Sequence, residues 1–194
     1  AALKITAGDL VYDGTIDMDG HAGTQGGAWD QSGAAGGSVW VTAGTLSGTG
    51  GTIGADGGRH GHRWGDTGGG GGRIALYCDS STYASTNGVH GWELPAMTAR
   101  GGQGSSDSWD GSAGTVYVDC GDSRNTLLID GGSISAAGAV ERPTLLVDSN
   151  MTSYSFNEVK MVRNTWLAFA PYDTSTSTVT VSLANASGDA TSTL

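Results

Sequence analysis

The sequence has few charged residues and very little lysine or glutamate. Charged side chains make up 14% of its 194 residues, and acids outnumber bases by 19 to 9, which gives a net charge of −10. Lysine occurs at Lys4 and Lys160 alone. This scarcity of good helix formers argues against a helical protein. Nucleic-acid binding needs clustered lysine and arginine, so we expect no nucleic acid among the partners.

Long hydrophobic runs are also missing. No apolar stretch approaches the roughly 20 residues of a membrane span, and the first residues do not form a signal-peptide pattern. We therefore expect no membrane span. The chain opens on Ala1-Ala2-Leu3 without an initiator methionine, which indicates either a processed mature chain or a piece of a longer protein.

Glycine, by contrast, is in large excess. There are 35 glycines among the 194 residues, which is roughly 18%, whereas glycine makes up about 7% of ordinary proteins. Of these glycines, 34 lie in residues 1–138 and only Gly188 follows. This change predicts a boundary between a glycine-rich region, 1–138, and a glycine-poor region, 139–194. We expect the second region to form further β coils or a β cap with a Ser/Thr-rich tail.

Two short motifs recur along the chain. ITAGDL at 5–10 returns as VTAGTL at 41–46, and GTI at 14–16 returns at 51–53. Weaker copies follow, and alternate residues of every copy are apolar, as the inward face of a strand requires. The expected apolar columns are Leu3, Val39, Ile74 and Val116; Ile5, Val41, Leu76 and Val118; Ala7, Ala43, Cys78 and Cys120; Ile16, Ile53, Met97 and Ile134; and Met18, Ala55, Ala99 and Ala136.

These columns predict an all-β fold, a parallel β-helix (solenoid) whose equivalent strands stack about 4.8 Å apart. The crossover rule predicts that this β-helix is right-handed. In the C-terminal part, TLLID at 126–130 returns as TLLVD at 144–148, which we interpret as one compact coil.

Three long glycine-rich excursions separate the copies, at 20–37, 57–72 and 101–114. Each leaves and rejoins the repeat at the same place and carries one tryptophan. Because glycine lets backbones approach closely, we expect ordered, polyglycine II-like excursions stacked beside the solenoid. Mobile loops are the alternative.

The stretches GGSVWVTAGTLSGTGGTIGADGG, GGGGGRIALY and AGTVYVD with TLLIDGG resemble the glycine-rich β-helical modules of large bacterial surface and adhesin-like proteins. The resemblance covers roughly residues 1–150. It implies an extracellular, structural or adhesive role and carries over no catalytic residues. In composition, the excursions are also similar to the polyglycine sandwiches of some phage tail-tip adhesins.

Cys78 and Cys120 are the only cysteines, and they occupy the same position in successive repeats. In-register neighbours in a parallel sheet lie within disulfide range. We therefore predict a disulfide that ties two coils together, as suits a secreted chain. Two buried free thiols are the alternative.

Exposed tryptophans are the best candidates for contact with a ligand. Trp29, Trp64, Trp92 and Trp109 could stack on sugar rings and so form a carbohydrate-binding surface. The favoured alternative is structural, because the tryptophan position recurs with the repeat. Each tryptophan would then plug the base of an excursion and supply core that glycine cannot.

Metal binding has weak support. His60 and His62, with His21 from the neighbouring excursion, could face a metal, but solvated loop histidines are the favoured interpretation. The many aspartates suggest calcium, yet the nonapeptide repeat of calcium-binding β-rolls is absent. We expect no metal and no other cofactor, with calcium as the alternative and turn-capping as the usual role of aspartate.

Catalysis has little support either, so we expect a non-enzymatic protein. The sequence contains no nucleophile motif, phosphate loop or cofactor fingerprint. Two sequons, at Asn150 and Asn185, are glycosylation candidates if the chain comes from an archaeal or eukaryotic secreted protein.

The leading hypothesis is an extracellular structural or adhesive protein at the cell surface, a subunit of a fibre or stalk. A carbohydrate-binding adhesin domain that contacts surface polysaccharide is the second, and a β-helical polysaccharide lyase or hydrolase the third. A solenoid exposes a strand edge at each end, so the chain is expected to join copies of itself or neighbouring modules head to tail. Excision from a longer solenoid is the alternative. The expected assembly anchors are Leu3, Ile5, Val179, Val181 and Leu183.

Overall fold

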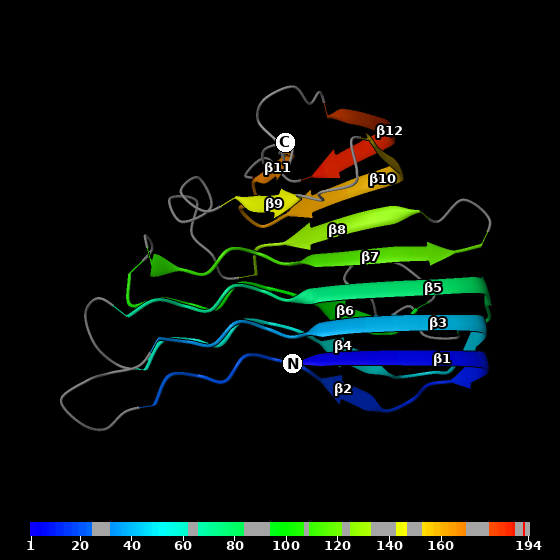
Figure 1. The fold of residues 1–194 in the computed structure, drawn as a ribbon, viewed down its shortest axis with the longest axis horizontal. Coiled ribbons are helices and arrows are strands. Elements are labelled where there is room, and N and C mark those ends of the chain that lie inside the picture. Colours follow the sequence, from blue (N-terminus) through cyan, green and yellow to red (C-terminus); the bar gives the residue numbers. More distant parts are fainter. Residues whose placement is uncertain are drawn as a thin grey trace.

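The structure is a computed structural model that describes residues 1–24, 32–61, 66–83, 94–106, 109–121, 125–132, 143–146, 153–169, 179–188 and 192. Over these residues the chain is all-β, as predicted from its composition, and its strands form three sheets (Figure 1). None of the described residues forms a helix long and apolar enough to cross a membrane.

Long strands form a seven-stranded sheet, called the long sheet below. Between them in sequence come short strands that form two smaller sheets, one three-stranded and one two-stranded. The long sheet contains, in spatial order, β1 (Ala2–Val11), β3 (Ser38–Ser47), β5 (Arg73–Ser81), β7 (Thr115–Cys120), β8 (Thr126–Asp130), β10 (Ser153–Val162) and β12 (Thr180–Gly188). The short strands are β2 (Thr15–Asp17), β4 (Thr52–Gly54) and β6 (Ala96–Thr98) in one sheet, and β9 (Thr144–Leu146) and β11 (Leu167–Phe169) in the other.

The register of the first four long strands confirms the predicted columns. Parallel pairing aligns Leu3 with Val39, Ile74 and Val116, and Ile5 with Val41, Leu76 and Val118. Ile16, Ile53 and Met97 align in the same way in the three-stranded sheet. Apart from Leu3, the residues of these columns belong to the first hydrophobic core, between the long sheet and the three-stranded sheet. Ile134 and Ala136, the expected last members of their columns, lie outside the described residues.

The chain reverses direction between β7 and β8. These two strands pair antiparallel, whereas every other described strand pair is parallel. Gly121, next to the reversal, has φ +51°, and a Cβ there would lie 2.2 Å from the carbonyl oxygen of Asp79. Only glycine accepts both conditions without strain. The sequence analysis did not predict this reversal.

The reversal moves the core to the other face of the long sheet. Tyr117 alternates with Val116 and Val118 and so points away from the first core, and it packs against a second core with residues of β8, β10 and β11. In β8, Leu128 belongs to the first core, while Leu127 and Ile129 belong to the second. β8 is therefore buried on both faces.

The interpretation of 126–130 and 144–148 as stacked copies is wrong. The first segment is β8 of the long sheet, and the second contributes β9, which pairs with β11 in the two-stranded sheet. Within the long sheet, Leu127 aligns with Val159 instead. Two similar apolar strand motifs thus occupy different sheets. The predicted boundary at residue 138 lies outside the described residues.

The strands before the reversal form the first half of the chain and those from β8 onward form the second half. A buried carboxylate at the end of β8 connects these two halves. The Asp130 side chain is 5% exposed and accepts hydrogen bonds from Arg163 Nε at 2.6 Å and from Arg100 Nε at 3.2 Å. Burial by itself raises the pKa of Asp130, but hydrogen bonds from Arg163 and Gly132 and the two arginine charges lower it overall. Arg100 follows β6 and Arg163 follows β10, so Asp130 links both halves.

Candidate functional site

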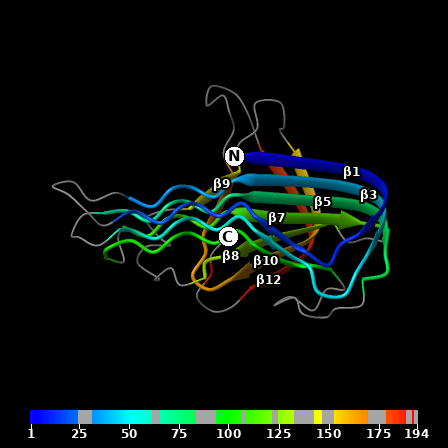
Figure 2. The same cartoon turned by 90° about the horizontal axis from the view of Figure 1, so that it is seen from below.

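Two features of the described chain are unlike ordinary β structure. One is a glycine slab, which consists of the outgoing segments 18–24, 55–61 and 99–106 and the returning segments 32–37, 66–72 and 109–114. It extends beyond the ends of the strands, at the left of Figures 1 and 2. The other is a row of aromatic rings on the outward face of the long sheet.

The glycine slab is held together by backbone hydrogen bonds between neighbouring segments. In one chain of contacts, Gly111 N–H donates to Gly102, Gly102 to Gly69, Gly69 to Gly58, and Gly58 to Ala34. Bonds of the same kind recur every third residue, as in Gly72 to Ala55 and Gly69 to Gly58. Three residues is the turn of an extended polyproline II-type helix, which has no internal hydrogen bonds and so offers its backbone to neighbours.

Glycine is required in the slab because the segments touch through their backbones. A Cβ on Gly69 would lie 1.9 Å from the carbonyl oxygen of Ala34, and one on Gly102 would lie 2.0 Å from that of Gly58. These distances leave no room for any side chain. The same overlap occurs at Gly20, Gly33, Gly36, Gly57, Gly58, Gly68, Gly71, Gly72, Gly111 and Gly114. The described parts of the excursions are stacked side by side, as expected.

Aspartates join successive repeats of the sequence by accepting hydrogen bonds from backbone N–H groups. Asp19 Oδ1 accepts from Asp56 N at 2.6 Å, and Asp56 Oδ1 accepts from Arg100 N at 2.6 Å. Asp13 accepts from Thr49 N, and this bond lowers its pKa. Burial raises the pKa of Asp19, and the charge of Asp56 adds to the rise. Within the described part of the chain, no three His, Cys, Asp or Glu side chains lie close enough to hold a metal ion.

The predicted ligand tryptophans fall mostly outside the described residues, which include neither Trp29, Trp64 nor Trp92. Trp109 is 40% exposed and lies at the far turn of its excursion, where its backbone N–H donates to the carbonyl oxygen of Ser106. It does not plug the base, which Gly114 closes by donating to Ala99. For Trp109 the plug interpretation is therefore wrong, and its ring is accessible.

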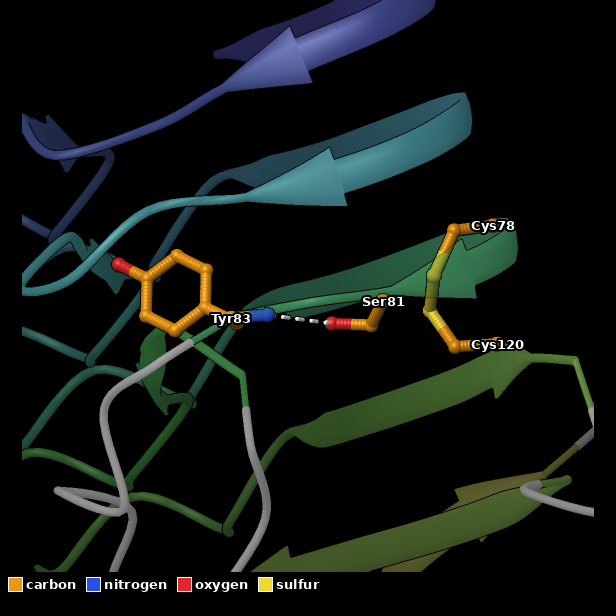
Figure 3. The surroundings of a disulfide bond; sticks show 4 residues. All are labelled: Cys78, Ser81, Tyr83 and Cys120. Atoms are coloured by element: carbon orange, nitrogen blue, oxygen red, sulfur yellow. Dashed lines mark hydrogen bonds between the residues drawn. A yellow bond between two sulfur atoms is a disulfide. The ribbon is translucent and has the colours of Figure 1, made fainter.

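The cysteines are joined by a disulfide bond. Cys78 on β5 and Cys120 on β7 are in-register partners with Cα atoms 4.3 Å apart (Figure 3). This agrees with the pairing expected from the repeat. Tyr83, which follows β5, is buried, and its hydroxyl donates to Tyr12 O at 3.0 Å, so it is linked to the segment that follows β1. Sequence reasoning missed Tyr83.

The expected assembly anchors differ between the two ends. Leu3 and Ile5 are half-buried on the free edge of β1. Val179, Val181 and Leu183 are also half-buried, but they pack against the second core of their own chain. Of the two sequons, Asn185 is exposed on β12, and Asn150 lies outside the described residues.

Aromatic rings form a continuous stack across the outward face of the long sheet. The ring centroids of Trp40 and Tyr77 are 5.0 Å apart, those of Tyr77 and Tyr117 are 5.5 Å apart, and those of Tyr117 and Phe156 are 6.2 Å apart. The stack runs from Trp40, which is 46% exposed, to Phe156 in the second core. Its rings come from four strands of the long sheet.

The hydroxyls in this stack are perturbed. Burial raises the pKa of Tyr117 to about 12, and the nearby Asp119 charge, with a hydrogen bond between the two side chains, adds to the rise. Burial and Asp119 also raise the pKa of Tyr77. A groove of about 510 Å³ lies beside the stack, lined by Trp40 and Tyr117 among others. Sequence analysis noted no site here, although these aromatics occupy outward positions of the repeat.

The chain matches no protein-family profile, no curated protein and no solved structure. Its function therefore has to be argued from the slab, the sheet edges and the aromatic face.

Proposed function

We propose that the chain is a non-enzymatic structural or adhesive protein that works outside the cell, as a subunit of a surface fibre or a stalk. Its two halves are coils of a right-handed parallel β-helix, and its glycine slab is a polyglycine II lattice. The core positions support this assignment. With a fixed crossover hand, reversing the strand direction moves the connecting strands to the opposite face of the sheet, and the second core does lie on the opposite face.

The single observation that carries the proposal is the edge of the long sheet at β1, where β3 is the one described strand that pairs with β1. Val39 and Val41 on β3 are each 2% exposed, whereas Leu3 and Ile5, at the same repeat positions one strand away, are half-buried. An uncovered strand edge with apolar side chains beneath it is a template for another strand. A strand paired with β1 would cover the exposed side of this row, as β1 covers that side of the row on β3.

The strand directions specify how copies would join. β1 runs parallel to β7, and β12 runs parallel to β8, which is antiparallel to β7. β1 and β12 thus run in opposite directions. A head-to-tail contact between β12 of one copy and β1 of the next would repeat the antiparallel geometry of β7 and β8. Such a heterologous contact forms filaments unless its rotation closes a ring.

The disulfide supports an extracellular setting. Disulfides persist in oxidising compartments and are rare in the cytosol, where thiols are kept reduced. Cys78 and Cys120 are bonded. The net charge of −10 and the slab of backbone hydrogen bonds suit a solvated structural element.

The first prediction tests the two edges separately. Ile5→Lys places a charge under the open edge of β1, and Leu183→Lys does the same at β12. Because both side chains are half-buried, the lysine amine can reach solvent and the chain stays folded. Wild-type protein should assemble with rising concentration in analytical ultracentrifugation, and each variant alone should remain monomeric. An equimolar mixture should stop at a heterodimer, because each variant has one open edge and the joining of these two edges leaves only blocked ones.

Thr6→Lys, on the exposed outward face of β1, is the matched control and should assemble like wild type. Circular dichroism checks that all variants are folded. A wild-type chain that stays monomeric at millimolar concentration would defeat the proposal, as would unchanged assembly of Ile5→Lys.

A further inference from the structure

The outward face of the long sheet has a groove whose aromatic and charged residues are not among the proposed assembly anchors, although Leu3 also lines it. Where the long strands begin, Lys4, Trp40, Ala75 and Tyr117 align in one row across β1, β3, β5 and β7. The small side chain of Ala75 leaves a depression between the two aromatic residues. The groove along this row has a volume of about 510 Å³.

The aromatic wall of the groove is held in place without a ligand. Trp40 Nε1 donates to Thr42 Oγ1 at 3.0 Å, and the indole stacks on Tyr77 with 25° between the ring planes. Tyr117 makes a tilted contact with Tyr77 and an edge-on contact with Phe156, which belongs to the second core. Trp40 nevertheless remains 46% exposed. A large apolar ring that is both exposed and fixed is ready to bind, because little side-chain entropy is lost on contact.

The charge of the groove opposes that of the chain. Lys4 and Arg73 both line it, and no acidic residue is among its lining residues, although the chain has a net charge of −10. Neither cation forms an ion pair with any residue that the structure describes. The carboxylate of Asp119, further along the same face, interacts with the Tyr117 hydroxyl. The groove is thus a small cationic site on an acidic protein.

We propose that this groove binds a segment of an acidic polysaccharide that carries carboxylates on alternate sugars. The C–H face of a pyranose is weakly positive and packs on the negative face of an aromatic ring, which Trp40 supplies. Lys4 lies on β1 and Arg73 on β5, with β3 between them. The two strands are therefore roughly 10 Å apart in the direction across the sheet. This spacing is close to the length of a disaccharide, so each cation can meet one carboxylate.

Single-stranded nucleic acid also stacks on aromatic rings beside cations. It carries a phosphate on every nucleotide, however, and its affinity depends on many neutralised phosphates. Two cations on a chain with a net charge of −10 can neutralise few phosphates. The observations therefore favour the sparsely charged sugar chain, and nucleic acid becomes an outcome of the test.

The second prediction uses a hexasaccharide of alternating uronate and N-acetylhexosamine, together with the same hexasaccharide after its carboxyls are reduced to alcohols. Titration calorimetry and tryptophan fluorescence report binding. Wild type should bind the acidic sugar at least tenfold more tightly than the reduced one. Trp40→Ala should lose at least tenfold for both sugars, and Trp40→Phe should recover most of the loss. The double variant Lys4→Ala/Arg73→Ala should bind both sugars equally weakly.

Trp109→Ala and Arg59→Ala remove an exposed ring and an exposed charge elsewhere and should bind like wild type. Absence of binding at millimolar sugar would overturn the inference. So would a loss caused by Trp109→Ala and not by Trp40→Ala, or equal binding of a thymidine hexanucleotide. Ultracentrifugation of the groove variants separates this inference from the assembly proposal, because they leave Ile5 and Leu183 intact.

Discussion

At the scale of single residues, the glycine slab shows how the absence of a side chain determines the fold. A chain with 35 glycines would be expected to lose too much backbone entropy to order. Here each slab segment approaches its neighbours so closely that its N–H groups donate at regular intervals to carbonyl groups of other segments. The glycines therefore compensate their entropy cost through backbone contacts that no other residue permits.

Two adjacent glycines provide the third prediction. A Cβ on Gly69 would lie 1.9 Å from Ala34 O, whereas a Cβ on Gly70 would meet Ser112 Oγ at 3.6 Å and nothing closer. Gly69→Ala should lower the free energy of unfolding by about 3 kcal/mol, the upper end of what overpacking costs. Gly70→Ala should be neutral or stabilising by up to about 1 kcal/mol, because it restricts the unfolded chain. Urea unfolding measures both, and equal effects would contradict the lattice contacts.

At the scale of elements, the disulfide joins β5 to β7 across the last excursion of the first half. Cys78 and Cys120 are 42 residues apart in sequence. Closing a loop of this length in the unfolded chain is worth about 4 kcal/mol in the chain-entropy model.

The fourth prediction follows from that loop. Reduction should lower the free energy of unfolding by about 4 kcal/mol, as measured by urea unfolding with and without a phosphine reductant. The double variant Cys78→Ala/Cys120→Ala should show the lower stability in both conditions. A wild-type chain that is equally stable in both would mean that the disulfide does not form in solution.

The strands also show which features of the fold could be predicted from the sequence and which could not. Apolar alternation predicted the columns of β1, β3, β5 and β7, because each inward position must be apolar in every coil. The reversal at β8 was missed, since strand direction depends on the connection after Cys120 rather than on the strand itself. A signal was present, because the unbroken apolar run Leu127 to Ile129 indicates burial on both faces. The aromatic groove was missed because ring stacking between strands needs the register and the rotamers together.

At the scale of the whole molecule, Asp130 couples two halves whose cores lie on opposite faces of one sheet. Its carboxylate is 5% exposed and is paired with Arg100 of the first half and Arg163 of the second. Removing one partner from a buried ion pair costs about 3–5 kcal/mol. Here both guanidinium groups reach solvent, at 31% and 40% exposure, so a smaller loss is expected.

The fifth prediction concerns Asp130→Asn, which should lower the free energy of unfolding by about 2 kcal/mol at pH 7. The pKa of Asp130 is lower in the folded chain than in the unfolded one. The stability that it contributes is therefore complete above the unfolded pKa of about 3.9 and is lost as the pH falls through the folded pKa. Urea unfolding from pH 7 to pH 2 should show the difference from wild type shrinking below about pH 4.

Asp79→Asn, on an exposed carboxylate, is the control for this series. A difference between wild type and Asp130→Asn that persists unchanged at pH 2 would mean that the ion pair is not its cause.

The slab has a further consequence for how such a chain can diversify. Gly37 donates to Met18, Gly72 to Ala55 and Gly114 to Ala99, so each excursion closes at the equivalent position although each is two residues shorter than the one before. The next bonds inward, Ala34 to His21, Gly69 to Gly58 and Gly111 to Gly102, keep the same spacing from the base. All the variation in length is therefore confined to the far ends. Insertions and substitutions there leave the lattice intact, so natural selection can rewrite the three tips independently while the rest of the protein is inherited unchanged.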